Sequence, residues 1–339
     1  MPPVASIVVC VYNRASQVSA CLDSLLALTE SAVEVVLVDD GSTDETPRVL
    51  QAYREAHPNR LIVIERNPQN LGVSGARNSG IRAAAGEFVA FTDSDCTVDA
   101  GWLTALLQGF TGPTVAAVSG TVVDHPPRTT AERAYVGTCR IGQTPWQGRA
   151  LVGNNMAFRR EVLFQYLFDQ SLRYGCDEDD LAWRLRSDGY QIRFAPGAIV
   201  HHNHPMTVRQ YWRTAIRQGQ GSARFWYKRG TYMGRDILPI TLAALTLPLG
   251  LLATWLLLVP AIFALVQLAA LVYNQFALKG KNVATAVGVL PVEVVYCACK
   301  TLSVYRTLAR ILSGSEPEIR ESKRRWWAAR QNPRPPLQP

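Results

Sequence analysis

Two aspartates at the end of an apolar run are the residues of this sequence best placed to bind a metal ion. Asp93 and Asp95 flank Ser94 and follow Phe88–Phe91, which we expect to be a buried strand. Carboxylates at positions i and i+2 leave the strand on the same side, at the sheet edge where open α/β proteins bind ligands. Their oxygens suit Mg²⁺ or Mn²⁺, which keeps positions open for substrate phosphates. The alternative is that these aspartates only form a turn and cap a helix.

Polar residues also follow two earlier strand-like runs. Tyr12 and Asn13 come after Ser6–Val11, and Asp39 and Asp40 end the run that begins at residue 35. An aromatic ring can stack on a base and a carboxylate can accept its N–H, so these ends predict a nucleotide site. Turn chemistry for the aspartates and simple packing for Tyr12 are the alternatives. The sequence has no P-loop motif and no glycine-rich dinucleotide motif after the first strand.

The first hundred residues alternate between strand and helix patterns. We expect strands at 6–11, 35–38, 61–64 and 88–91, and a small-residue helix over 72–85. Ser42 and Glu45 resemble a capping box at the start of another helix. This alternation predicts an α/β fold with a doubly wound, mostly parallel sheet.

Two further segments carry side chains that could do chemistry. Residues 177–180 are four consecutive carboxylates, a run that repels itself and commonly begins a helix when it is exposed. His201, His202 and His204 follow the strand-like pair Ile199–Val200. Residues 202 and 204 would share one face of an extended segment, or else the three histidines belong to a solvated turn.

Taken together, these segments resemble the family 2 glycosyltransferases, which are inverting enzymes with the GT-A fold that use nucleotide-sugar donors. The resemblance covers about residues 5–230. It is carried by Ser6–Arg14, Val38–Asp44, Asn70–Gly80 and Asp93–Asp95.

The resemblance implies roles for individual residues. Asp95 would be the main protein ligand of a metal that bridges the donor diphosphate, with His202 and then His204 as an additional contact. Segment 153–160 would lie beside the donor sugar, although it also fits a turn that leads into a strand. The donor or nucleotide contacts would be Tyr12, Asn13, Asp39, Asp40, Arg77, Asp93, Ser94, Asn154 and Asn155.

The acidic run resembles the family segment that supplies the catalytic base. Inverting transfer is a direct displacement, so the acceptor hydroxyl must lose a proton to a positioned carboxylate. Glu178 occupies the usual base position, where the family more often has Asp preceded by Glu. Because Asp177 and Glu178 reverse that order, Asp179 remains an alternative base.

Charge and hydropathy point to a membrane. The net charge is +8, and the basic residues cluster after about position 205 beside aromatic and apolar segments, which suits an anionic membrane better than nucleic acid. Residues 237–278 contain no Asp, Glu, Lys or Arg. The length of this uncharged segment is about twice the ~20 residues that one span requires. We expect a hairpin of two spans, 237–257 and 259–278, with both ends and the catalytic domain in the cytoplasm. The apolar segment 283–312 contains Glu293, Lys300 and Arg306 and is expected to be interfacial or re-entrant, with a third span as the alternative.

Seven cysteines without a C-x-x-C pair predict a reducing compartment rather than a disulfide framework or a zinc site. The sequence therefore predicts a GT-A type, Rossmann-like α/β domain followed by C-terminal transmembrane helices, in a multi-pass protein of the plasma membrane. The expected domains are a nucleotide-sugar-binding half at 1–115, an acceptor and catalytic-base half at 116–230, a membrane region at 231–312 and a basic, Pro-rich cytoplasmic tail at 313–339.

The expected reaction moves a sugar from a UDP-, GDP- or dTDP-sugar to a hydroxyl of a lipid or lipid-linked glycan, with Mg²⁺ or Mn²⁺ and without nucleic acid. A nucleotidyltransferase would use similar residues with a phosphate nucleophile and no acidic base segment. A non-catalytic membrane scaffold with a degenerate transferase domain is the other alternative.

Overall fold

The computed structural model describes residues 2–28, 32–136, 151–173, 175–230, 238–248, 257–273, 275 and 282–331. Contacts within the chain define two units. The first, which we call the sheet unit, comprises Met1–His125, Cys139–His204 and Trp327–Pro339. The second, the helical unit, comprises Pro126–Thr138 and Pro205–Trp326.

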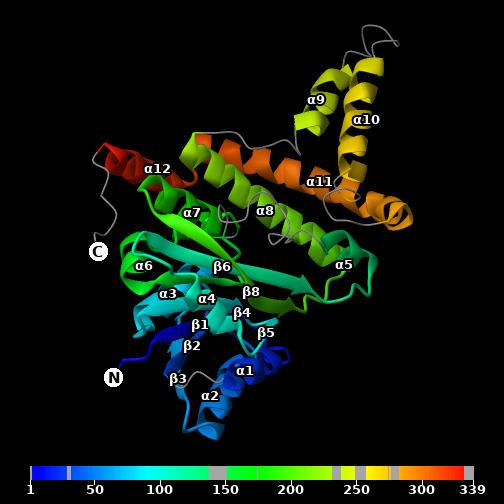
Figure 1. The fold of residues 1–339 in the computed structure, drawn as a ribbon. Coiled ribbons are helices and arrows are strands. Elements are labelled where there is room, and N and C mark those ends of the chain that lie inside the picture. Colours follow the sequence, from blue (N-terminus) through cyan, green and yellow to red (C-terminus); the bar gives the residue numbers. More distant parts are fainter. Residues whose placement is uncertain are drawn as a thin grey trace. The chain divides into compact units, whose positions relative to one another are not determined.

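The sheet unit is built on eight strands in the order β3-β2-β1-β4-β7-β6-β8-β5 (Figure 1). They are β1 (Ala5–Val11), β2 (Val33–Asp39), β3 (Leu61–Arg66), β4 (Phe88–Asp93), β5 (Cys96–Val98), β6 (Val115–Asp124), β7 (Met156–Arg159) and β8 (Gln191–His202). β3, β2, β1 and β4 are parallel neighbours, as are β6 and β8. β7 is antiparallel to β4 and β6, and β5 is antiparallel to β8. The predicted mostly parallel α/β sheet is confirmed.

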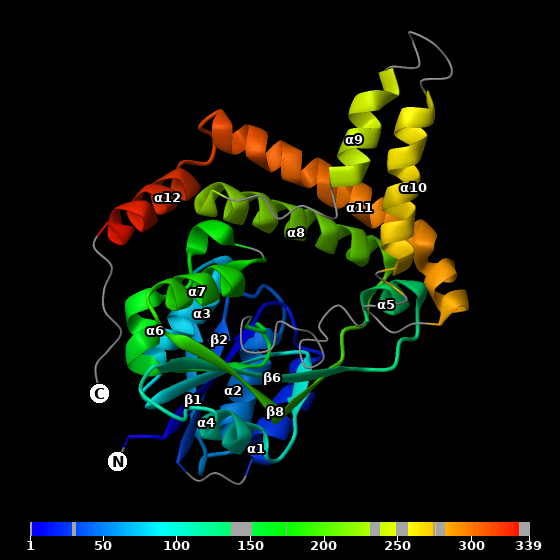
Figure 2. The same ribbon diagram turned by 45° about the horizontal axis from the view of Figure 1, so that its top comes forward.

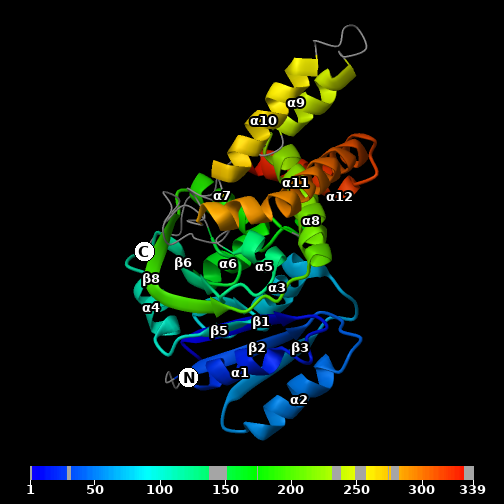
Figure 3. The ribbon, with the colours of Figure 1, turned by 90° about the vertical axis from the view of Figure 1, so that its right-hand side faces the viewer.

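Helices cover both faces of the sheet because its central strands are apolar on both sides. They are α1 (Val18–Leu26), α2 (Thr46–Ala56), α3 (Gly72–Ala83), α4 (Trp102–Gln108), α6 (Arg160–Tyr166) and α7 (Asp177–Ser187). Ile7 and Val9 of β1 pack in one core cluster with α1, α2 and α4, whereas Val8 packs in a second cluster with α3, α6 and α7. Figures 1 and 3 show α1 and α2 on one side of the sheet and α3 and α6 on the other.

The helical unit contains α5 (Thr130–Tyr135), α8 (Val208–Arg229), α9 (Leu238–Thr246), α10 (Leu258–Tyr273), α11 (Val283–Leu312) and most of α12 (Pro317–Arg330). A capping box of Thr207 and Gln210 begins α8, and Gly230 ends it with φ +72°. α8 and α11 lie side by side (Figure 1). They approach closely at Gly219, where a Cβ would lie 2.5 Å from the carbonyl oxygen of Lys300.

The apolar C-terminal region forms helices, but only part of the predicted hairpin lies in the described residues. α9 covers part of the first predicted span and α10 most of the second, while 237, 249–256, 274 and 276–278 lie outside the described residues. Among the described helices, Ala284–Leu312 is the one long and apolar enough to cross a membrane, and Leu258–Tyr273 is shorter. The segment expected to be interfacial is therefore the one with the length of a span. The sequence did not predict α12, and the end of the tail, 332–339, lies outside the described residues.

Candidate functional site

The carboxyl ends of β1, β2 and β4 lie at one edge of the sheet because these strands are parallel neighbours. Each strand leads directly into polar residues singled out from the sequence: β1 into Tyr12, β2 into Asp40 and β4 into Asp95. Sequence spacing thus predicted the correct edge of the sheet for all three.

Strand pairing brings further polar residues beside this edge. β6 and β8 place Asp124 opposite His202, and β5 places Cys96 opposite His202 on the other side. Residues directly opposite in neighbouring strands project from the same face, so these three side chains lie together.

Asp95 lies at the centre of the resulting cluster. Its Oδ2 is 3.0 Å from Nδ1 of His204 and 3.9 Å from Arg14, and its Oδ1 is 3.7 Å from Nε2 of His202. The two imidazole rings stack with centroids 5.2 Å apart, so the prediction that 202 and 204 share a face is confirmed. Burial acts to raise the pKa of Asp95, but the hydrogen bond with His204 and the charges of His202 and Arg14 hold it below its ordinary value.

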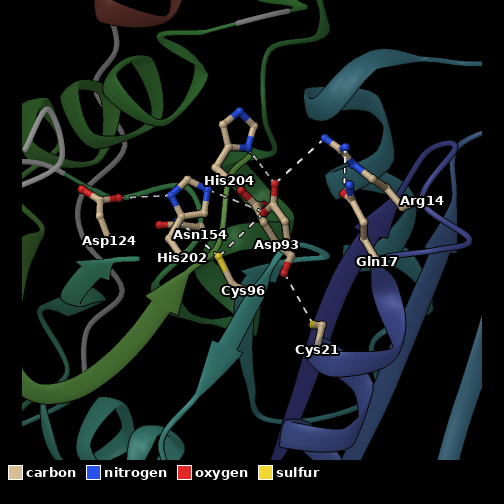
Figure 4. Close-up of polar contacts among 10 residues, drawn as sticks. Arg14, Gln17, Cys21, Asp93, Cys96, Asp124, Asn154, His202 and His204 are labelled. Atoms are coloured by element: carbon tan, nitrogen blue, oxygen red, sulfur yellow. Dashed lines mark hydrogen bonds and ion pairs between the residues drawn. The ribbon is translucent and has the colours of Figure 1, made fainter. Parts of the chain in front are cut away.

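A second carboxylate orients His202. Its Nδ1 is 3.3 Å from Oδ1 of Asp124, as Figure 4 shows. Its Nε2 faces Oδ1 of Asp95 at 3.7 Å. Burial acts to lower the pKa of His202, yet the bond to Asp124 and the charges of Asp95 and Asp93 raise it above its ordinary value. The local field therefore favours positive charge. His201 projects to the other face, where it is exposed and 2.8 Å from Asp99.

The groups around Asp95 fit a divalent cation. An Asp95 oxygen, a His202 nitrogen and the Cys96 sulfur lie within 4.8 Å of one another. Burial, with nearby Asp93 and Asp95, raises the pKa of the Cys96 thiol far above its ordinary value, so the thiol stays protonated. Asn154 donates to this thiol at 3.4 Å, and its buried Oδ1 has no hydrogen-bond partner among the described residues. A carboxylate, imidazoles and a spare amide oxygen suit Mn²⁺ or Mg²⁺ better than a thiolate zinc site.

Asp93 and Ser94 complete the end of β4. Ser94 is buried, and Asp93 is half-buried. Burial raises the pKa of Asp93 and the neighbouring charge of Asp95 adds to that effect, although Arg77 opposes it. The pair of like charges again marks a point where a cation would be stabilised.

At the ends of β1 and β2, most polar side chains hold the loops. Asn13 accepts the Thr43 N–H at 2.9 Å and donates its own N–H to the Ser42 hydroxyl at 3.0 Å. Asp39 accepts the Ser42 N–H at 2.9 Å. The predicted capping box at Ser42 is wrong, because this hydroxyl serves Asn13 and α2 has no side-chain cap. Tyr12 differs, since 45% of it is exposed.

Asp40 is buried, and both of its carboxylate oxygens accept hydrogen bonds. Oδ1 accepts from the side chain of Asn67 at 2.8 Å and the N–H of Leu71 at 2.9 Å, and Oδ2 accepts from the N–H of Gly72 at 3.1 Å. Burial raises the pKa of Asp40 against these bonds, which act to lower it. The carboxylate therefore fixes the start of α3, whatever else it binds.

Arg77 connects α3 to the acidic run. Its guanidinium is 2.7 Å from Oδ2 of Asp177, donates to the carbonyl of Gly153 at 2.9 Å and lies over the ring of Phe168. Both partners of the ion pair are buried. Arg77 thus orients the first turn of α7, and its contact with a nucleotide stays a prediction.

The four carboxylates of the acidic run have different surroundings. Asp177 is paired with Arg77, and Asp180 is buried 2.7 Å from Arg184, so both hold the fold. Asp179 is exposed. Residue type alone does not separate these positions, whereas burial does.

Glu178 is the half-buried member of the run, with 27% of its side chain exposed and Arg77 4.0 Å away. A Cβ on Gly153 would lie 3.2 Å from its Oε1, so the carboxylate borders the 153–155 segment. Burial, with the charge of Asp177, raises the pKa of Glu178 well above its ordinary value, although Arg77 opposes the shift. This environment keeps a carboxylate basic.

The two asparagines of the 153–160 segment are used differently. Asn154 lies beside the cluster through Cys96. Asn155 is fully buried; it accepts from the indole of Trp102 at 2.9 Å and donates to the carbonyls of Thr121 and Ala198, each at 2.8 Å. Asn155 therefore ties the strands together beneath the site.

Two members of the cluster, Asp124 and Cys96, were not selected from the sequence, and Arg14 lies within the recognised segment Ser6–Arg14 but was given no role of its own. Cys96 adjoins the Asp93–Asp95 motif, so its position was a usable signal. Asp124 had none, because only the pairing of β6 with β8 brings it to His202.

Comparisons with known proteins show which families and folds this chain resembles. The family models described as "Glycosyl transferase family 2" and "Glycosyl transferase family group 2" match residues 6–167 and 88–278. A pre-mycofactocin glycosyltransferase of Mycobacterium tuberculosis is 30% identical over 270 residues, covering 74% of this chain. The chain spans about half of that relative's length, 52%.

A glucosyl-dolichyl phosphate glucuronosyltransferase of Haloferax volcanii is 31% identical over 171 residues, covering 47% of this chain and 54% of its own. Among solved structures, the mannosyltransferase PcManGT from Pyrobaculum calidifontis, in complex with GDP-Man and Mn²⁺, aligns with a TM-score of 0.58. It covers 89% of this chain and 88% of its own at 24% identity, which shows a shared fold.

Proposed function

The chain belongs to the family 2 glycosyltransferases, whose family group 2 model matches more than half of its 339 residues, and from this premise we propose the reaction that it catalyses. It moves a sugar from a nucleotide-diphosphate donor to an acceptor hydroxyl, with inversion at the anomeric carbon. The observation that carries this proposal is the convergence of His202 and His204 on Asp95 at the carboxyl edge of a GT-A sheet.

Asp95, His202 and His204 would hold Mn²⁺ or Mg²⁺, which supplies the positive charge that neutralises a departing diphosphate. The field at His202 supports this assignment, as does the Mn²⁺ bound to the solved mannosyltransferase. Tyr12 would stack on the base, with Asp40 beside it. The other donor contacts would be Asn13, Asp39, Arg77, Asp93, Ser94, Asn154 and Asn155, several of them by holding loops of the site.

Glu178 would be the general base. As the acceptor oxygen bonds to the anomeric carbon, its proton passes to the Glu178 carboxylate, and the bond to the leaving phosphate oxygen breaks on the opposite face. Arg77 and Asp177 would keep Glu178 in place, and Asp179 is the alternative base.

The acceptor would be a lipid or lipid-linked glycan, and the donor a UDP-, GDP- or dTDP-sugar. Support comes from the apolar helices of the C-terminal region and from the archaeal relative named for a dolichyl phosphate substrate. Helices α9 and α10 would anchor a multi-pass protein in the plasma membrane, with catalysis in the cytoplasm. Residues 1–115 would bind the donor and 116–230 would supply the base and meet the acceptor.

A donor screen tests the reaction. Purified full-length protein with Mn²⁺ is incubated with labelled UDP-, GDP- or dTDP-sugars and a polar lipid extract. We expect the label to enter the lipid fraction with release of nucleoside diphosphate, and the new linkage to have inverted configuration. Transfer of a nucleoside monophosphate would instead identify a nucleotidyltransferase, and donor binding without any product would favour a scaffold.

A further inference from the structure

α11 has the length of a span, but α8 covers one side of it along much of that length. Trp212 donates to the carbonyl of Val292 at 3.3 Å, and Ser303 donates to the carbonyl of Ile216 at 2.7 Å. The contacts advance in the same direction along both helices. Because α8 and α11 are packed together, α11 cannot enter the hydrocarbon of a bilayer unless α8 enters it too.

The interface between α8 and α11 is polar where a membrane span would be apolar. Glu293, in the first half of α11, is buried and accepts hydrogen bonds from the hydroxyl of Tyr211 in α8 at 2.9 Å and from Gln275 at 2.6 Å. The side of α11 that carries its acidic residue thus faces protein and not lipid.

Exposed arginines on α8 oppose a crossing of the bilayer. Arg209, Arg213 and Arg217 recur every four residues and are all exposed. If α11 crossed the bilayer, these side chains would enter or closely border hydrocarbon, where an arginine is costly.

The opposite side of α11 is an exposed apolar stripe. Its members are Val287, Pro291, Val294, Val295, Leu302, Tyr305, Ala309 and Leu312. They fall within an arc of roughly 100° on a helix of 3.6 residues per turn. Arg306 and Arg310 are exposed beside one edge of this α11 stripe. An apolar stripe bordered by cations is the pattern of a helix that lies in the surface of an anionic membrane.

Helix α9 contacts α11 on the side of the stripe. The hydroxyl of Tyr305, a member of the stripe, is 2.9 Å from the hydroxyl of Thr241 in α9. Figures 1 and 2 show α9 and α10 side by side and projecting away from the line of α11. Both carry exposed leucines, such as Leu245 and Leu265. If these two helices enter a bilayer, α11 lies across their direction.

We propose that α11 lies along the surface of an anionic bilayer, with the α11 stripe at the boundary of headgroups and acyl chains and with Arg306 and Arg310 against lipid phosphates. This proposal rests on the membrane anchoring proposed above, because α9 and α10 bring the stripe to the lipid. In this arrangement α8 and α11 lie on the surface of the leaflet that would contain the lipid-linked acceptor.

Depth-dependent fluorescence quenching tests the placement. A fluorescent amino acid replaces Val287, Val295, Leu302 or Leu312, one at a time, in the full chain reconstituted in nanodiscs of phosphatidylcholine and phosphatidylglycerol. Lipids brominated near the headgroup or near the chain end serve as quenchers. We expect similar quenching at all four positions. Quenching by lipids brominated near the headgroup should be at least twofold stronger than by lipids brominated near the chain end. Graded depths, with positions 295 and 302 quenched most by deep bromines, would show a span and overturn the proposal.

Ala52, exposed on α2, provides a matched position that we expect to remain unquenched. Lack of quenching at all four α11 positions would also overturn the proposal, because the stripe would then face water or protein. Donor binding by each variant confirms that it is folded. Sugar transfer is assayed separately, so a failure of the reaction with shallow quenching intact would fault the proposed function and leave the placement standing.

Discussion

Two groups of polar side chains lie at the same edge of the sheet, and the fold uses them differently. At the ends of β1 and β2, Asn13, Asp39 and Asp40 are bonded to neighbouring loops. At the ends of β4 and β8, Asp95 and His202 face each other with their charges directed at a common point. Polar residues that look alike in sequence therefore hold loops in one group and, in the function proposed here, would bind a cation in the other.

This contrast predicts how substitutions should differ. Changes beside β4 and β8 should lower metal affinity, because these side chains face a common point at the end of the sheet. Changes at the end of β2 should lower stability, because they remove partners from backbone N–H groups.

Glu178→Gln should have the largest effect on turnover. The amide cannot accept the proton, so we expect the rate of sugar transfer to fall by about 10²–10⁴-fold, the usual contribution of a general base. Donor affinity, measured by calorimetry, should be unchanged. Asp179→Asn is the matched control and should retain most of the rate; the reverse result would give the role to Asp179.

Asp95→Ala should cause the largest loss of metal affinity. Mn²⁺ binding is measured by the electron paramagnetic resonance of free Mn²⁺. We expect the affinity to fall by more than the ~10–100-fold typical when a residue that hydrogen-bonds to a metal ligand is removed. Asp99→Ala is the matched control. It removes a carboxylate that pairs with exposed His201 on the other face of β8, so Mn²⁺ affinity should not change. Normal Mn²⁺ binding by the Asp95 variant would refute the assignment of the cluster.

Asp124→Ala should weaken Mn²⁺ binding by about 10–100-fold, because the imidazole of His202 loses the partner that orients it. Asp124→Glu should restore part of the affinity. Loss of folding stability with unchanged Mn²⁺ affinity would reduce Asp124 to a structural role.

Asp40→Asn should mainly destabilise the sheet unit. One carboxylate oxygen becomes an amide nitrogen that cannot accept from the N–H of Leu71 or Gly72, at a cost of about 1–3 kcal/mol in the free energy of unfolding. Urea unfolding measures this change. Mn²⁺ affinity should stay the same, and a loss of Mn²⁺ affinity at unchanged stability would erase the contrast between the two groups.

The pH profile should show the smallest effect. Glu178 works as a base only when ionised, and because burial raises its pKa, kcat/KM should fall on the acid side at a pH above the ordinary range for glutamate. Asp179 contributes to that rise, so Asp179→Asn should move the acid limb to lower pH. A profile unmoved by this change would show that another group governs the limb.

The order of motifs along the sequence determined the family, the sheet class and the sheet edge at which the candidate site residues lie. This works because strand and turn patterns are local, and because parallel neighbouring strands present their carboxyl ends together. The apolar run at 6–11 and the small-residue segment at 72–85 appear as β1 and α3 with nearly the expected bounds.

Only the tertiary structure decided which polar side chains form hydrogen bonds within the protein and which face the candidate site. The Ser42 hydroxyl accepts a hydrogen bond from the N–H of Asn13 and does not cap a helix. Asn155 is hydrogen-bonded to the Trp102 indole and to two carbonyls, and Asp124 contacts His202 because distant strands β6 and β8 pair. Similarly, the charged residues of 283–312 favoured an interfacial segment over a third span, whereas its polar packing against α8 depends on which residues face the neighbouring helix. Hydrogen-bond occupancy and burial arise from contacts between segments far apart in the chain, and spacing along one segment does not encode them.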